Sequence, residues 1–126
     1  MREEVERWLT AFAKAVRERD FETGLTLYDA HATAFGTRVR WAQDAKVYLE
    51  GQWQPIWNSS SGYEFTEILR IDHSGDLIAV STLWTNNTEI DGIVKFRSGR
   101  ASFVLRRIDD RLVAIQSHYS EDPVKA

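Results

Sequence analysis

The order of two hydrophobic patterns along the chain constrains its fold more than any other feature. Residues 3–18 carry apolar side chains at helical spacing, with charged side chains on the opposite face. From residue 63 onward, apolar residues alternate with polar ones, as in half-buried β-strands. A helix with an apolar stripe must bury it, and the predicted sheet is the only large partner available. The stripe consists of Val5, Trp8, Leu9, Phe12 and Val16.

This order predicts an α+β fold. A strongly twisted sheet that curls around a helix leaves a cavity at its open end. We therefore predict a cone in which a curved antiparallel sheet wraps around N-terminal helices and encloses an interior pocket. The 126 residues, 43% of them hydrophobic, suit one domain that spans 1–126.

Short helices and one strand are predicted before the main sheet. Asp20 is placed to cap a second helix that runs to about Tyr28. A short strand at 32–37 follows. The helical pattern of 44–57 is interrupted by a glycine and a proline, so we expect one or two short helices there, lying as a lid over the sheet.

The second half of the chain predicts the main strands, which we place at 63–71, 77–85, 100–108 and 111–119. The composition of 58–62 and 86–92 is typical of loops, and Asp109-Asp110 predicts a tight turn. Residues 93–97 form either a strand of their own or an extension of the next strand past a bulge at Ser98-Gly99.

Composition and charge argue against several classes of protein. The formal net charge of -3 is spread along the chain, which favours neither a nucleic-acid partner nor a membrane surface. The chain has no cysteine for a disulfide or a thiolate metal site, and its three histidines are too dispersed to predict a metal centre. The N-terminus is charged where a signal peptide is apolar, and no apolar run could span a membrane. We expect a cytoplasmic protein without metal or cofactor.

The last strand suggests one wall of the pocket. Strict alternation puts one set of its side chains on a common face, which changes from apolar to polar along the strand. This set is Leu112, Ala114, Gln116, His118 and Ser120. Such a face can begin in a core and end in a cavity, with His118 in the pocket floor. Alternatively, the strand is an edge strand that frays toward solvent, and His118 is an ordinary surface residue.

Arg100 is the candidate for binding an anionic ligand. If Asp109-Asp110 is the turn, residues near 100–102 lie opposite residues near 117–119, which brings Arg100 beside His118. A guanidinium at the mouth of a partly apolar cavity favours a carboxylate, through paired hydrogen bonds. The alternative is a solvated surface arginine.

Aromatic side chains can supply the rest of the pocket. Five tryptophans are many for a chain of this length. Trp57 lies on the predicted lid and Trp84 near the end of a strand, where flat side chains can hold a ring-bearing or apolar ligand. Tyr28 is assigned to the same ligand-binding set. Packing in the core or in a dimer interface is an equally simple role for any one of them.

The residues specify no reaction, and the catalytic residues stay unknown. The chain has no nucleophile elbow, no glycine-rich phosphate loop and no HExxH-type spacing. The candidate carboxylates are Asp29, Glu64, Glu67 and Asp91. No motif places any of them beside a second acid, as the general acid and base of an isomerase would require.

Three C-terminal segments, 99–107, 109–112 and 117–120, resemble the SnoaL-like families of the nuclear transport factor 2-like (ketosteroid-isomerase-like) superfamily. Those families typically read G-R-A-T, a hydrophobic strand, a D-G turn, W, and H-x-H-x-S. Segments 25–37 and 52–57 resemble the strand entry and the tryptophan-containing helix. The association domain of calcium/calmodulin-dependent kinase, an oligomeric module with an arginine-containing pocket, shares the same ending.

The resemblance implies the cone fold, a pocket on the concave side and homodimers that pack through the sheet. His118 and Ser120 match the second histidine and the serine of the motif, whereas Gln116 replaces the first histidine. This replacement argues against any two-histidine mechanism. The other departures are Ser102 for threonine, Asp110 for glycine and Leu112 for tryptophan.

Two hypotheses remain. In the first, the chain binds a small organic molecule, such as a carboxylate, either as a binding protein or as an isomerase-, cyclase-, dehydratase- or hydrolase-type enzyme. It predicts that Arg100 and His118 point inward and that Trp57 and Trp84 wall the cavity. In the second, the chain is a homodimerising association module with a non-catalytic pocket. That hypothesis predicts an apolar outer sheet face, for which we nominate Phe103, Leu105, Val113 and Ile115.

Overall fold

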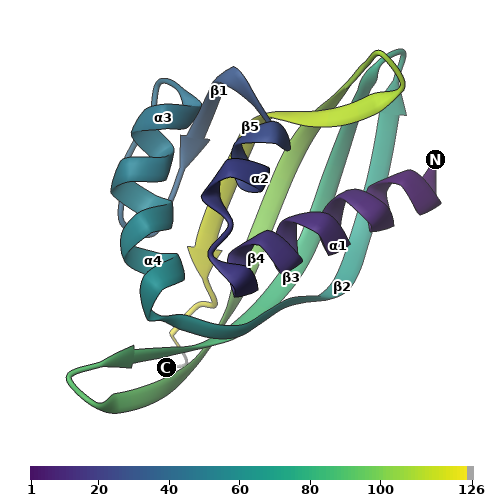
Figure 1. Cartoon of the computed structure of the whole chain (residues 1–126). Coiled ribbons are helices and arrows are strands. Elements are labelled where there is room, and N and C mark those ends of the chain that lie inside the picture. Colours follow the sequence, from purple (N-terminus) through teal and green to yellow (C-terminus); the bar gives the residue numbers. More distant parts are fainter. Residues whose placement is uncertain (125–126) are drawn as a thin grey trace.

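The two N-terminal helices come first in the chain and lie against the curved sheet, as the order of the two patterns predicted (Figure 1). One strand and the remaining helices follow before the four strands of the main sheet. The computed structural model describes residues 1–124. Helix α1 (Arg2–Glu18) buries the predicted stripe against the sheet and ends at Arg19, which adopts a left-handed conformation with φ of 55°. Asp20 caps α2 (Phe21–Thr26) by accepting a hydrogen bond from the Thr23 amide at 3.0 Å, as expected.

The predicted lid consists of three short helical pieces that follow one another without a break: α3 (Ala45–Tyr48), the π-helical turn η1 (Leu49–Trp53) and α4 (Gln54–Ser59). Asp44 caps the first piece through the Val47 amide, at 2.8 Å. The glycine that interrupted the pattern, Gly51, lies inside η1. A Cβ there would come within 2.5 Å of the Val39 side chain, so the close approach of the neighbouring loop requires glycine.

The sheet has five strands, in the order β1-β5-β4-β3-β2. Their bounds are β1 Tyr28–Phe35, β2 Ser60–Ser74, β3 Leu77–Ile90, β4 Ile93–Ile108 and β5 Arg111–Glu121. Strands β2 to β5 form the predicted antiparallel meander, with the tight turn at Asp109-Asp110. Strand β1 pairs in parallel with β5, so the sheet is mixed and not wholly antiparallel. The chain between these two parallel neighbours contains the lid and strands β2 to β4.

Two predicted loops are regular structure. Residues 58–62 complete α4 and begin β2. Residues 86–90 continue β3, and 93–97 continue β4 without a bulge, so the two strands extend as a ribbon that ends at Asp91-Gly92. Both turn residues have positive φ, 53° and 78°, as two-residue hairpin turns require. Figure 1 shows this ribbon, which we call the arm, projecting beyond the rest of the sheet.

The core lies between α1 and the concave face of the sheet. Phe103 and Leu105 face inward on β4 and are almost fully buried, where Phe103 contacts Trp8 edge to face. Their assignment to an apolar outer face was therefore wrong, because the inward alternation of β4 runs through its odd-numbered residues. Among the helices of residues 1–124, none combines the length and the hydropathy that a membrane span would need.

Candidate functional site

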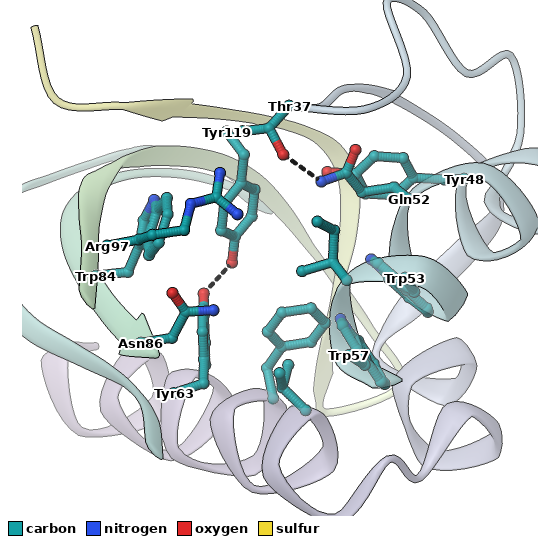
Figure 2. Close-up of a pocket in the computed structure, with 13 residues that line it drawn as sticks. Thr37, Tyr48, Gln52, Trp53, Trp57, Tyr63, Trp84, Asn86, Arg97 and Tyr119 are labelled. Carbon is teal, nitrogen blue, oxygen red and sulfur yellow. Dashed lines mark hydrogen bonds between the residues drawn. The ribbon is translucent and has the colours of Figure 1, made fainter. Parts of the chain in front are cut away.

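A cavity of about 40 Å³ lies between the lid and the end of the concave sheet face (Figure 2). Its lining comes from α1, the lid, the loop after β1, and strands β2 to β5. The lining residues are Phe12, Val16, Thr37, Tyr48, Gln52, Trp53, Ile56, Trp57, Tyr63, Trp84, Asn86, Arg97 and Tyr119. Thr37 is exposed and Arg97 is partly exposed, so the cavity opens to solvent beside these two residues.

Aromatic rings form most of the wall. Trp53 and Trp57 stack with ring centroids 4.7 Å apart, and Phe12 of α1 meets both edge to face at 5.7 Å. Trp84 faces them from β3, near Tyr63. The structure thus brings the predicted Trp57 and Trp84 to one cavity. Trp53 reaches it because it closes the π-helical turn, a feature that is frequent at functional sites.

Gly99 allows Trp84 to lie flat on the sheet. The two residues are directly opposed on β3 and β4, and the indole N–H of Trp84 donates to the Arg100 carbonyl at 3.2 Å. A Cβ on Gly99 would fall 2.4 Å from the Trp84 ring and 2.2 Å from the Ser120 carbonyl oxygen. The glycine predicted to mark a bulge instead makes room for a wall of the cavity.

Two buried tyrosines share a hydrogen bond inside the cavity. The hydroxyl of Tyr63 (β2) and that of Tyr119 (β5) are bonded to each other. Burial raises the pKa of both phenols well above their ordinary 10.0, so both are neutral at physiological pH. One hydrogen bond uses one of the two phenolic hydrogens, and the second hydrogen is left to donate to another acceptor.

Asn86 presents an unpartnered polar atom to the same cavity. Its side chain is 3% exposed, and its Nδ2 donates to Ser60 Oγ at 2.8 Å. Its Oδ1 is the one buried side-chain polar atom in residues 1–124 that has no hydrogen-bond partner. Buried polar groups without partners are uncommon in native proteins and mark places where a water or a ligand completes the bonding.

Among the described residues of the lining, Arg97 alone is charged, and Glu121 already neutralises it. It lies directly opposite Asn86 in the β3–β4 pairing. Its guanidinium bonds both carboxylate oxygens of Glu121, at 3.0 and 2.8 Å, and this hydrogen bonding lowers the pKa of the Glu121 carboxyl. None of the described lining residues is Asp, Glu or His, so the cavity offers no side chain of the types that usually act as a general base.

Gln52 ties the lid to the loop at the cavity mouth. Its Nε2 donates to Thr37 Oγ1 at 2.8 Å, and its Oε1 accepts from the amides of Arg38 and Val39 at 2.7 and 3.2 Å. A Cβ at Gly36 would lie 2.3 Å from Gln52 Oε1, so this set of Gln52 hydrogen bonds, which we call the latch, also requires glycine at the start of the loop.

His118 does not face the cavity. Strand β5 carries a β-bulge: Val104 pairs with Gln116 and Leu105 with Ala114, which leaves Ile115 without an opposite residue. The bulge inverts the alternation, so Tyr119 turns inward and His118 is exposed on the outer face, beside Phe35 at 5.0 Å. The predicted inward orientation of His118 is wrong because it assumed an uninterrupted strand.

The same shift moves the other predicted polar contacts of β5. Gln116 is exposed on the outer face, and Ser120 accepts a hydrogen bond there from Arg100 Nε at 3.2 Å. Arg100 therefore also points away from the cavity, and it lies opposite Ser120, whereas His118 lies opposite Ser102. Tyr28 is buried in the core beside the cavity, where its hydroxyl bonds Ser117 Oγ at 2.8 Å.

Sequence reasoning assigned no site role to seven polar lining residues: Thr37, Tyr48, Gln52, Tyr63, Asn86, Arg97 and Tyr119. Two of them, Asn86 and Arg97, lie opposite each other where the arm leaves the sheet, which we call the arm's base. The sequence predicts a loop for part of this region, residues 86–92. The inward alternation of Ile78, Val80 and Trp84 continues at Asn86, and that period of two was the available signal.

Comparisons with known proteins agree with this architecture. The family model described as the SnoaL-like domain matches residues 5–125, whereas no curated protein matches the chain. A nuclear transport factor 2-like superfamily protein from Salmonella enterica serovar Typhimurium superposes with a TM-score of 0.84 at 14% identity, over 98% of this chain and 92% of that one. A ketosteroid isomerase-like protein from Erwinia carotovora atroseptica gives 0.77 at 17%, over 95% of each chain.

The association domain of C. elegans CaMKII is a third similar structure, with a TM-score of 0.71 at 17% identity over 94% of each chain. At these identities the structural likeness establishes the fold and not the function. The family match covers nearly the whole chain, from the first helix to beyond the last strand. The chain therefore belongs to the SnoaL-like domain family, within the nuclear transport factor 2-like fold.

Proposed function

We propose that the chain binds a small, partly apolar molecule in the cavity beneath the lid. One observation carries the proposal: the Asn86 Oδ1 atom is buried in an aromatic-walled cavity without a hydrogen-bond partner. Leaving such an atom unsatisfied costs roughly 1–3 kcal/mol, which a protein tolerates most readily where the atom serves a ligand. The neighbouring tyrosine pair adds a donor, and the tryptophans add apolar contact area.

The size of the cavity limits how the ligand is held. About 40 Å³ has room for roughly three waters, whereas a cavity that takes benzene measures about 150 Å³. A ring-bearing ligand therefore places only part of itself in the closed end. The remainder extends past Thr37 and Arg97 at the mouth, or the lid moves outward. The proposal is for binding, and no reaction is assigned, because the part of the chain that the structure describes places no carboxylate or imidazole in the lining.

Two neighbouring residues of β5 make a matched test. Tyr119 faces the cavity and His118 faces outward, so Tyr119→Phe and His118→Ala alter opposite faces of one strand. Neutral and anionic cyclic compounds would be screened by thermal shift and by tryptophan fluorescence, since three tryptophans line the cavity. We expect binders whose stabilisation, about 2.7 kcal/mol at 100 times Kd, is reduced in Tyr119→Phe and kept in His118→Ala. Failure of every compound, or equal loss in both variants, would refute the proposal.

Association of copies of the chain is a second candidate, favoured by the arm. Its exposed apolar side chains are Ile90, Ile93, Val94 and Phe96, each exposed by 63 to 72%. An isolated two-stranded ribbon gains little stability from itself, and exposed apolar patches commonly mark interaction sites. This observation supports association through the arm in addition to the homodimer through the sheet face that the family resemblance implies. Two variants distinguish these surfaces when their oligomeric state is measured by sedimentation. Phe96→Ser alters the arm, whereas Arg106→Ser alters the outer sheet face.

A further inference from the structure

Resting on this proposed function, we infer that the cavity selects an uncharged molecule that carries a hydroxyl or a primary amide, and that it discriminates against carboxylates. The polar group of the ligand bridges the Asn86 side chain and the Tyr63–Tyr119 pair. The sequence suggests carboxylate recognition by Arg100, but this arginine lies on the opposite face of the sheet, outside the cavity.

The first step concerns what Asn86 lacks. Ser60 Oγ bonds one end of the amide, and a serine hydroxyl cannot reach both ends at once. The other end, Oδ1, is buried in the cavity lining with no protein partner. An amide oxygen accepts hydrogen bonds and cannot donate them, so its complement on the ligand is an O–H or an N–H group.

The second step concerns what the tyrosine pair lacks. The two hydroxyls share one hydrogen bond, so one phenolic hydrogen needs an acceptor. The β2–β3 pairing matches Ser61 with Asn87 and Glu64 with Thr85, which puts Asn86 opposite the stretch that contains Tyr63. The required donor and acceptor therefore lie close together on the ligand. A hydroxyl supplies both through one atom, and a primary amide supplies both within one planar group.

The third step concerns charge. Arg97 is bonded to both oxygens of Glu121, so this pair at the cavity mouth has no net charge. Within residues 1–124, every other side chain that lines the cavity is uncharged, the two tyrosines included. A ligand carboxylate would enter beside Glu121, and it would be buried without a compensating cation of its own. Burying an unpaired charge is far less favourable than burying a hydrogen-bonded neutral group.

Three matched probes test this inference: benzamide, N,N-dimethylbenzamide and benzoate. They share the ring, but the second lacks the N–H donors and the third carries a negative charge. Binding to the intact chain would be titrated by tryptophan fluorescence, with thermal shift as a second readout. We expect benzamide to bind at least tenfold more tightly than either analogue. Benzoate equal to or tighter than benzamide would overturn the inference while leaving the proposed binding function standing, whereas no response to any probe would refute that function itself.

Variants separate the three steps. Asn86→Leu removes the unpartnered acceptor and should abolish the preference for benzamide over its dimethyl analogue; a preserved preference overturns the first step. Glu121→Gln leaves Arg97 uncompensated, so benzoate should bind at least fivefold more tightly while benzamide changes less than twofold. An unchanged benzoate affinity would overturn the third step. Arg100→Ala, on the outer face, is the control that should alter none of these affinities.

Discussion

Replacing Asn86 by leucine should stabilise the unliganded protein, because the native side chain holds a buried oxygen without a partner. The substitution keeps the number and branching of the side-chain heavy atoms and removes both polar atoms. It also breaks the bond from Asn86 Nδ2 to Ser60 Oγ, and Ser60 itself is 4% exposed. The cleaner perturbation is therefore the pair Asn86→Leu and Ser60→Ala, which replaces both partners of that bond by apolar groups.

The magnitude follows from the energetics of buried polar groups. Relief of an unsatisfied buried acceptor is worth about 1–3 kcal/mol, and a typical net hydrogen bond contributes about 1 kcal/mol. The single variant should then gain roughly 0–2 kcal/mol, since it leaves the Ser60 hydroxyl without its partner. The double variant should gain about 1–3 kcal/mol, because exchanging both partners of a bond for apolar groups is nearly neutral.

Urea unfolding measures this directly. With a slope of about 2 kcal/mol per molar urea, the double variant should raise the midpoint by roughly 0.5–1.5 M without changing the slope. The same variant should lose affinity for any cavity ligand, which would make the site a place where stability is given up for binding. A double variant that unfolds at lower urea than the wild type would refute the reasoning, since Asn86 would then be a net structural contributor.

Three further predictions concern the cavity wall, the lid and the buried phenols. Gly99→Ala should destabilise by about 1–3 kcal/mol in urea unfolding, because its Cβ would fall 2.4 Å from Trp84. Gln52→Ala should speed hydrogen exchange at the Arg38 and Val39 amides, whose bonds to Oε1 it removes; unchanged exchange would show that the latch is not formed. All four tyrosines have a pKa raised above 10.0 by burial. As the pH rises, the unfolded chain therefore releases phenolic protons at a lower pH than the folded chain does. The free energy of unfolding should fall above pH 10 by up to about 1.4 kcal/mol per pH unit for each tyrosine. Phenolate absorbance should rise in the same step as unfolding, and a rise well before unfolding would contradict this.

The fold was predictable because its strongest signals are local or periodic. The stripe of α1 needs a partner of matching size, and the caps at Asp20 and Asp44 depend on a few neighbouring backbone amides. The Asp109-Asp110 turn fixes the β4–β5 hairpin for the same reason. These features require no knowledge of which strands meet across the sheet. The parallel pairing of β1 does require it, and the sequence pattern does not contain that information.

The site was less predictable, because it depends on which face each strand turns inward. In the arm's base, Asn86 and Arg97 are polar residues at inward positions. Composition assigns Asn86 to a loop and leaves 93–97 open between a separate strand and an extension of the next strand. Their burial follows from the pairing of β3 and β4, which is a long-range property. The tryptophans were the exception, since a large flat side chain on a lid or at a strand end has few places to go other than an enclosed apolar space.

The bulge at Ile115 explains why a motif can identify a family and still mislead about its site. A resemblance aligns residue identities, and His118 matches the second histidine of the family's motif. The face that a strand residue occupies depends on the number of residues between it and the core, and one unpaired residue reverses that face for everything beyond it. Tyr119, which no motif marks, thereby takes the inward position next to Tyr63, and His118 packs outside on Phe35. Site residues can therefore be transferred between members of this family only after the bulge in the last strand has been located in each.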